Sequence, residues 1–402
     1  MRERRLLYVT AFARAVSTSL VGVLLGVYLA RNGISGVAFG AIVSAGLLGA
    51  SSAAVAATFW GDRVGRRRFL LVLTAASALG TIAFALSSSP LALGAASFLG
   101  MLNGMGKDRG AALILEQAAL PSLAPEAERT RTIAWYTMLQ DLGHGVGAAL
   151  AGLAPALGGR ARLSGAEPHR VLLLGCAGLA LVTLLGYARL GRGLDAPSST
   201  AGARRVTRES RAILTRISGL FALDALGGGF LTAAMLSYFF FERFGASEAA
   251  IGGLFAAARL MNAGSHLGAA WLARRIGLVK TMVFTHLPSS LLLMTVAIAP
   301  SFGVAAVLFL LREGLVEMDV PTRQSYVLAV VQPEERTFAS GITNLVRLIA
   351  WAVAPLVAGA LASGDNLHVP LLVGAALKIA YDVLLWRAFS AIRPPEERLA
   401  QG

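Results

Sequence analysis

Charged residues and cysteines are both scarce in this chain of 402 residues. Asp, Glu, Lys and Arg together make up 14% of it, against about 25% in an average soluble domain, whereas apolar residues make up 56%. The mean hydropathy of +0.67 agrees with this composition. The single Cys176 excludes an internal disulfide and a cysteine-based metal site. The composition therefore indicates a chain that is surrounded by lipid rather than by water.

Motifs for nucleotide-driven or catalytic chemistry are also missing. We find no Walker-type phosphate loop and no nucleophile motif in an apt context, and His144, His266 and His286 lack the spacing of a metal site. The net charge of +14 is spread over short basic runs between apolar segments, which does not favour nucleic acid as a partner. We expect a protein that is not an enzyme, has no cofactor or metal, and is not driven directly by ATP.

Twelve apolar segments are long enough to cross a bilayer, at roughly 20 residues per span. Loops assigned to the cytoplasm hold twenty-one basic residues and the opposite loops hold five, which predicts a multi-pass protein of a bacterial-type inner membrane with both termini cytoplasmic. The basic start and its long apolar run predict an uncleaved first helix. The predicted spans are 6–30, 37–60, 69–88, 91–113, 132–157, 169–188, 214–241, 249–272, 281–299, 301–323, 338–362 and 368–390.

The two halves of the chain are related to each other. Residues 35–40 (SGVAFG) correspond to 247–252 (SEAAIG), and Gly65 corresponds to Gly277, both at an offset of 212 (247 − 35 = 277 − 65). Several such matches in order indicate a duplicated six-helix unit. We expect an N-terminal bundle over 1–188, a cytoplasmic linker over 189–213, and a C-terminal bundle with a short cytoplasmic tail over 214–402.

A short charged loop joins the second and third predicted spans. It resembles the loop signature of the major facilitator superfamily, in which a glycine, an Asp-Arg pair, a second glycine and a basic cluster connect these helices. The resemblance implies an all-α membrane protein with twelve transmembrane helices in two pseudo-symmetric six-helix bundles, and a cytoplasmic gate at this loop. The gate-loop residues are Gly61, Asp62, Arg63, Gly65, Arg66, Arg67 and Arg68.

In the gate that this resemblance implies, Asp62 faces the start of the eleventh helix, near residues 337–340, where free N–H groups favour a carboxylate. The arginines of the loop would add ion pairs that hold the cytoplasmic side shut. The second copy of the loop has Arg274 in place of the aspartate, so the gate would be one-sided. An Asn-Gly-Met-Gly segment at 103–106 echoes proton-driven exporters of the superfamily, although the arginine that precedes it in those proteins is missing here.

Many ionisable residues fall inside the predicted spans, where an unpaired charge costs about 2.5–3.5 kcal/mol. They must face protein or a water-filled cavity. Lys107, Asp108 and Arg109, near the cytoplasmic end of the fourth span, serve either as gate and structure or as substrate contacts. The candidates for a substrate and proton cavity are Arg14, Asp141, Asp224, Arg259, Arg312, Glu313, Glu317, Asp319, Arg347 and Asp382.

Arg14 and Asp224 occupy equivalent places in the two halves (224 − 14 = 210). The superfamily's first and seventh helices line the central cavity, so the resemblance places both residues on the transport path. A buried salt bridge between them is the alternative. Three glycines, 227–229, follow Asp224 and suit either a segment that bends or close helix packing.

The tenth span is dense in acids. Glu313 and Glu317 share a helix face, and desolvated carboxylates near one another can carry a proton. The alternative is that Arg312, Arg323 and Arg347 neutralise the acids as fixed ion pairs. Pro321 is expected to break this helix near its cytoplasmic end.

We interpret the chain as a secondary transporter of a small organic solute that works by alternating access, with protons as the coupling ion and efflux favoured over uptake. The main alternative is a proton-coupled uptake symporter of a polar or anionic metabolite. A channel, a lipid flippase and a membrane-embedded enzyme are less favoured. The expected partners are the solute, protons and membrane lipid, and the monomer is expected to be functional.

Overall fold

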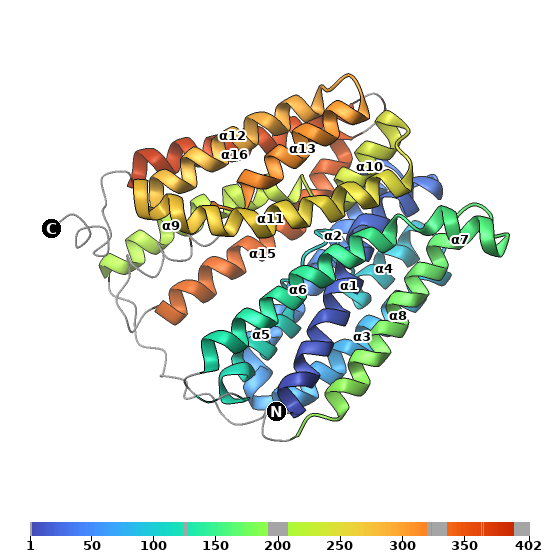
Figure 1. Cartoon of the computed structure of the whole chain (residues 1–402), viewed down its shortest axis with the longest axis horizontal. Coiled ribbons are helices and arrows are strands. Elements are labelled where there is room, and N and C mark those ends of the chain that lie inside the picture. Colours follow the sequence, from blue (N-terminus) through green and yellow to red (C-terminus); the bar gives the residue numbers. More distant parts are fainter. Residues whose placement is uncertain are drawn as a thin grey trace. The chain divides into compact units, whose positions relative to one another are not determined.

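The computed structural model describes residues 2–191 apart from 124, 126 and 127, together with 208–319, 323, 336–362, 364 and 366–389. All regular elements in these residues are helices, which Figure 1 shows in chain order. In the first half they are α1 (Arg2–Arg31), α2 (Gly36–Val64), α3 (Arg66–Leu86), α4 (Pro90–Gly100), α5 (Ala111–Ala119), the 3₁₀ turn Leu120–Leu123, α6 (Arg129–Ala151), α7 (Ala154–Ala161) and α8 (Glu167–Ala188). In the second half they are α9 (Arg208–Gly229), α10 (Ala233–Phe244), α11 (Glu248–Ile276), α12 (Leu278–Ala297), α13 (Phe302–Val316), α15 (Arg336–Leu361) and α16 (Val369–Phe389).

The predicted all-α membrane fold is confirmed. Eight described helical segments are long and apolar enough to cross a membrane. Each of the twelve predicted spans overlaps one helix or two consecutive helices: α4 and α5 for the fourth span, α6 and the start of α7 for the fifth, and α9 and α10 for the seventh. The chain is therefore an all-α, twelve-helix membrane protein.

Contacts divide the chain into two compact units. The first contains residues 1–199 with 232–256 and 355–365, and the second contains 200–231, 257–354 and 366–402. In the first unit, α1 packs against α6, α8 and α10, α3 packs against α8, and α2 packs against α4. In the second, α12 packs against α13 and α16, and α16 packs against α9. Most of the predicted linker, residues 192–207, lies outside the described residues.

The fourth predicted span, 91–113, is not one continuous helix. Helix α4 ends at Gly100, Met101 adopts a left-handed φ of 52°, and α5 begins only at Ala111. Gly106 has a φ of 68°, a conformation that glycine adopts without steric cost. An asparagine replaces the lost helical hydrogen bonds: Asn103 Nδ2 donates to Lys107 O at 2.8 Å, and Met105 N donates to Asn103 Oδ1 at 2.9 Å. Non-helical backbone at membrane depth must be satisfied in this way, inside protein.

The seventh span is also broken, directly after the three glycines. Helix α9 ends at Gly229 and α10 begins at Ala233, where Thr232 Oγ1 accepts the Met235 N–H at 3.0 Å and caps the new helix. A Cβ on Gly229 would lie 2.5 Å from the Ala354 Cβ. Both interpretations of the three glycines therefore agree with the structure. They lie at a helix break, and they permit close packing against a neighbouring helix.

Close helix contacts in the first unit depend on glycine. A Cβ on Gly26 of α1 would lie 2.1 Å from Ala234 O of α10, and one on Gly147 of α6 would lie 2.2 Å from Val16 O of α1. In a membrane, where lipid tails compete with apolar side chains, such close backbone approach is a main source of helix association.

We expect Gly26→Ala to lower the melting temperature of the purified protein, because the added methyl group meets backbone and overpacking costs about 1–3 kcal/mol. Gly178→Ala in α8 is the matched control, since nothing lies within 4 Å of its added Cβ. Its melting temperature should equal or exceed that of wild type, because alanine is the better helix former. Equal melting temperatures for the two variants would contradict the packing argument.

Candidate functional site

Arg14 is the centre of a buried charge cluster in the first unit. Its Nε donates to Asp108 Oδ2 at 2.5 Å, and its Nη2 donates to Glu116 Oε2 at 2.8 Å. The hydroxyls of Tyr136 and Tyr187 each donate to Glu116 at 2.5 Å. Arg14 Nη1 also donates to Tyr187 OH at 2.7 Å. Glu116, which is 0% exposed, is thus surrounded by donors, and we call these five residues the first charge cluster.

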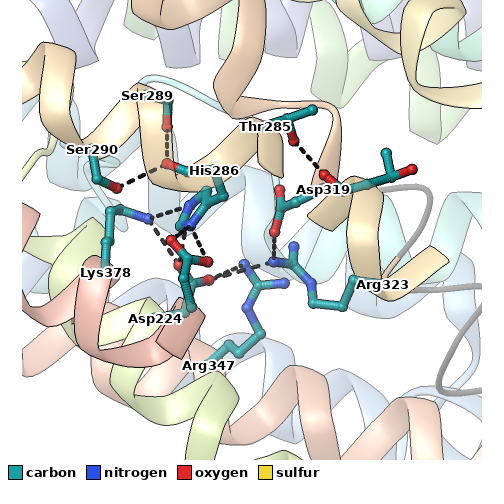
Figure 2. Close-up of polar contacts among 11 residues, drawn as sticks. Asp224, Thr285, His286, Ser289, Ser290, Asp319, Arg323, Arg347 and Lys378 are labelled. Carbon is teal, nitrogen blue, oxygen red and sulfur yellow. Dashed lines mark hydrogen bonds and ion pairs between the residues drawn. The ribbon is translucent and has the colours of Figure 1, made fainter. Parts of the chain in front are cut away.

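A second charge cluster lies in the second unit, where Figure 2 shows most of its side chains converging. Its members come from α9, α12, α15, α16 and the residues that follow α13. Three carboxylates and three cationic side chains are present, together with one histidine. The cluster consists of Asp224, His286, Asp319, Arg323, Arg347, Lys378 and Asp382.

Asp224 connects the cations of the second cluster. Lys378 Nζ donates to its Oδ1 at 2.8 Å, and Arg323 Nη1 donates to its Oδ2 at 3.4 Å. Arg347 Nη2 lies 3.5 Å from the same Oδ2 (Figure 2). Asp224 is only 3% exposed, so these contacts replace the water that a carboxylate needs. Arg14 and Asp224, the two equivalent residues, thus each have ion-pair partners within their own unit.

His286 on α12 lies between an acid and a base. Its Nδ1 is 2.9 Å and 3.0 Å from the two oxygens of Asp382, and its Nε2 is 3.3 Å from Lys378 Nζ. An ammonium group can only donate, so Nε2 accepts and Nδ1 carries the ring hydrogen toward Asp382. In this arrangement the ring is neutral, and the three carboxylates balance the three cations.

The backbone around His286 is locally weakened. Pro288 lies inside α12 and lacks the N–H that the helix needs there. The hydroxyls of Ser289 and Ser290 donate to His286 O at 2.7 Å and 3.0 Å, as Figure 2 shows. Such back-bonding commonly bends a helix, so α12 is able to adjust at the point that carries the histidine.

Two acids of the tenth span, Glu313 and Asp319, are ion-paired. Glu313 accepts from the Arg312 guanidinium, and its Oε2 accepts from Asn262 Nδ2 at 2.9 Å. Asp319 accepts from Arg323, four residues along the chain. These contacts favour fixed ion pairs over a proton-carrying pair of acids on this helix. Pro321 lies outside the described residues.

Some residues that were predicted to line the cavity do not belong to either charge cluster. Asp141 on α6, Arg259 on α11 and Glu317 directly after α13 are each half-buried. Arg14 belongs to the first charge cluster, while Asp224, Asp319, Arg347 and Asp382 belong to the second. The sequence thus indicated several members of each site but not their grouping.

The predicted gate loop is a tight connection between α2 and α3. Gly65 joins the two helices with a φ of 95°. Arg66 Nη1 donates to Ala118 O in the last turn of α5 at 3.2 Å, and Arg67 Nη2 donates to Ala188 O at the end of α8 at 2.6 Å. Arginines at helix C-termini satisfy the carbonyl groups left free there.

The other members of the gate loop have different surroundings. Gly61 is buried within α2, and Arg63 and Arg68 are exposed. The side chain of Asp62 lies outside the described residues. The gate role of the loop therefore stays a prediction.

Several members of both clusters were missed from sequence. Glu116 follows the end of the predicted fourth span, and no motif in the sequence marks Tyr136 or Tyr187. His286 was considered only as a metal ligand, and Lys378 only as one of many charges inside the spans. An available signal was the shared helix face of Lys378 and Asp382, which are four residues apart.

A multi-pass helical bundle with buried ionisable clusters and broken helices is typical of secondary transporters rather than enzymes. The sequence profile of the Major Facilitator Superfamily matches residues 7–355. The chain belongs to this family. It is therefore a multi-pass integral membrane protein and a transporter of small molecules.

Similar proteins agree with this assignment. An uncharacterized membrane protein of Saccharomyces cerevisiae, YJR124C, is 24% identical, with 96% of this chain and 93% of that protein covered. The crystal structure of the nucleoside transporter NupG is 13% identical, with a TM-score of 0.77 over 97% of this chain and 99% of that one. That of a D-xylose-proton symporter is 15% identical, with a TM-score of 0.74 over 96% and 97%. At these identities the two structures show the fold alone.

We expect Lys378→Met to destabilise the purified protein strongly, because removing one partner of a buried pair leaves an uncompensated charge and costs about 3–5 kcal/mol. Adding Asp224→Leu should recover part of the loss. The comparison is Arg4→Ala, which removes the ion pair with Glu128 at 2.8 Å; Glu128 is 50% exposed, and such pairs contribute about 0–1 kcal/mol. Thermal melting measures all three, and a Lys378→Met effect as small as that of Arg4→Ala would refute the cluster's role.

Proposed function

We propose that this chain is a proton-coupled secondary transporter of a small organic solute, and that His286 accepts the coupling proton. The observation that carries the proposal is the placement of an imidazole between Asp382 and Lys378, 2% exposed and within the second unit. Histidine is the side chain whose charge ordinarily changes between about pH 5 and 8. No other member of the second charge cluster has that property.

Asp224, which the sequence suggested as a proton carrier, is better suited to anchoring. Its two oxygens face Lys378, Arg323 and Arg347. A proton on Asp224 would leave three buried cations opposed by fewer acids, which is costly in a dry interior. A proton taken up at His286 Nε2 instead leaves Asp224 ionised, and it lies near Asp224 Oδ1, which is 3.7 Å from Nε2.

Proton binding at His286 would act on helix packing. A proton on Nε2 ends its acceptance from Lys378 and adds a positive charge 3.3 Å from the ammonium. The repulsion would displace Lys378. Because Lys378 on α16 is paired with Asp224 on α9, its displacement would also disturb the contact between these two helices. These helices approach closely, since a Cβ on Gly227 of α9 would lie 2.9 Å from Gly374 O of α16. A shift at Lys378 therefore passes directly to α9, which ends two residues beyond Gly227 at its break.

This coupling fits alternating access, in which parts of the protein move while a site alternately faces each side. The same cycle run in either direction gives efflux or uptake. We propose efflux, on the basis of the short loops and compact size of the chain. The orientation of the pH gradient that drives accumulation in vesicles distinguishes efflux from uptake.

We expect His286→Asn to lose pH-driven accumulation while energy-independent exchange persists. Asparagine can still donate to Asp382 from the position of Nδ1, but it does not titrate. The measurement uses proteoliposomes and a panel of labelled organic cations, anions and sugars, and follows the solute that wild type accumulates under an imposed pH gradient.

His368→Asn, in the turn before α16, is the matched control and should accumulate solute as wild type does. Thermal melting verifies that both variants are folded. Undiminished pH-driven accumulation by folded His286→Asn would overturn the assignment of the proton to this residue.

A further inference from the structure

A cavity of about 130 Å³ lies inside the first unit, apart from the second charge cluster. Its wall comes from α1, α3 and α8 and from the break between α4 and α5. Arg14 and Asp108 of the first charge cluster contribute to this wall. Broken membrane helices that border a cavity are a recurrent feature of transporter binding sites.

The wall presents hydrogen-bond acceptors to the cavity. Thr74 and Thr81 of α3 donate their hydroxyl protons to Leu70 O and Ser77 O, both at 2.7 Å, and Thr183 of α8 donates to Leu179 O at 2.9 Å. A hydroxyl has one proton and two lone pairs, so each of these oxygens can still accept but has no proton left to donate. A ligand that matches this wall brings N–H or O–H donors.

One further hydroxyl is available to a ligand. Ser17 Oγ lines the cavity and is buried, and it has no hydrogen-bond partner among the described residues. Cys176 Sγ lies 3.9 Å from Ser17 O and lines the same cavity. Leu73, Val21 and Leu102 supply apolar wall, so the cavity combines a polar and an apolar side, as ligand pockets commonly do.

The charged residues that line the cavity are Arg14 and Asp108. They pair with each other at 2.5 Å, and Arg14 also pairs with Glu116, which is not a lining residue. His144 does not add a cation in this arrangement, because its Nε2 accepts the Asp108 N–H at 3.0 Å. Lys107 and Arg109 are sequence neighbours of Asp108 but are not among the residues that line the cavity.

We infer that this cavity binds the ammonium group of a small organic cation, with the threonine oxygens accepting its N–H groups and the carboxylate of Asp108 lying in the same wall. The inference deepens the proposed transport function by naming the substrate class, and it rests on that function. A carboxylate ligand is disfavoured, because it has no proton to donate to these oxygens.

The single cysteine of the chain provides a reporter that needs no engineering. Cys176 is 3% exposed and lines the cavity, so a reagent that modifies it must enter there. The experiment measures the rate at which N-ethylmaleimide modifies the purified wild-type protein, read by mass. The probes are 2-phenylethylammonium, the neutral 2-phenylethanol and the anionic 3-phenylpropanoate.

We expect 2-phenylethylammonium to slow the modification about tenfold at about ten times its Kd. The alcohol should protect more weakly, and the carboxylate should not protect. Equal protection by the carboxylate, no protection by the ammonium, or a native protein that does not react while the unfolded protein does would each overturn the inference.

Thr74→Val and Thr183→Val test the acceptor wall, because valine keeps the shape and removes the oxygen. A hydrogen bond to a charged donor is worth about 1.5–3 kcal/mol, so each variant should need about tenfold or more of the ammonium for the same protection. Thr58→Val is the matched control, since Thr58 makes the same bond to Ala54 O at 2.8 Å but does not line the cavity. An unchanged reaction rate without ligand verifies that each variant retains the cavity.

This test is independent of proton coupling, because it needs no gradient and no transport. Protection that persists while His286→Asn behaves as wild type would refute the proton assignment alone. Proton-driven accumulation that depends on His286 without protection of Cys176 would refute the cavity alone.

Discussion

The structure depends on one constraint: an ionised side chain that is buried away from water must meet opposite charge or donors nearby. Each unit meets this constraint by itself. Glu116 in the first unit is enclosed by Arg14 and two tyrosines, and Asp224 in the second is enclosed by three cations. Because each cluster joins several helices, loss of one charge affects the packing of the whole unit. The clusters thus stabilise the helix packing, and a change in the charge of one member alters that packing.

The same constraint applies to the backbone. Two membrane spans are interrupted, and each interruption satisfies its free groups locally, through Asn103 in the fourth span and Thr232 in the seventh. The first interruption borders a cavity, and the second follows the helix that carries Asp224. Buried charges, interrupted helices and close glycine contacts therefore occur in the same parts of the structure. A charged species that binds there would act directly on the position of a helix.

The architecture was predictable because it rests on hydropathy and glycine-rich loop chemistry, both of which are local. The family and the twelve spans followed from such patterns, and the duplication drew attention to Arg14 and Asp224, which are both buried in ion pairs. The break after Gly100 was missed because hydropathy does not distinguish a helix from an apolar segment whose backbone turns. His286 and Glu116 were missed because their partners lie on other helices, and no sequence spacing records which side chains meet in space.

The central claim is that His286 changes its charge inside a cluster that is otherwise balanced. Nitrogen NMR of purified protein labelled with ¹⁵N-histidine tests it directly, since the chain has only five histidines and a His286→Asn sample assigns the relevant ring. The account predicts that this ring is neutral at the pH of one side of the transporting membrane and charged at the pH of the other. A His286 ring that keeps one protonation state across the pH gradient that drives accumulation would contradict it.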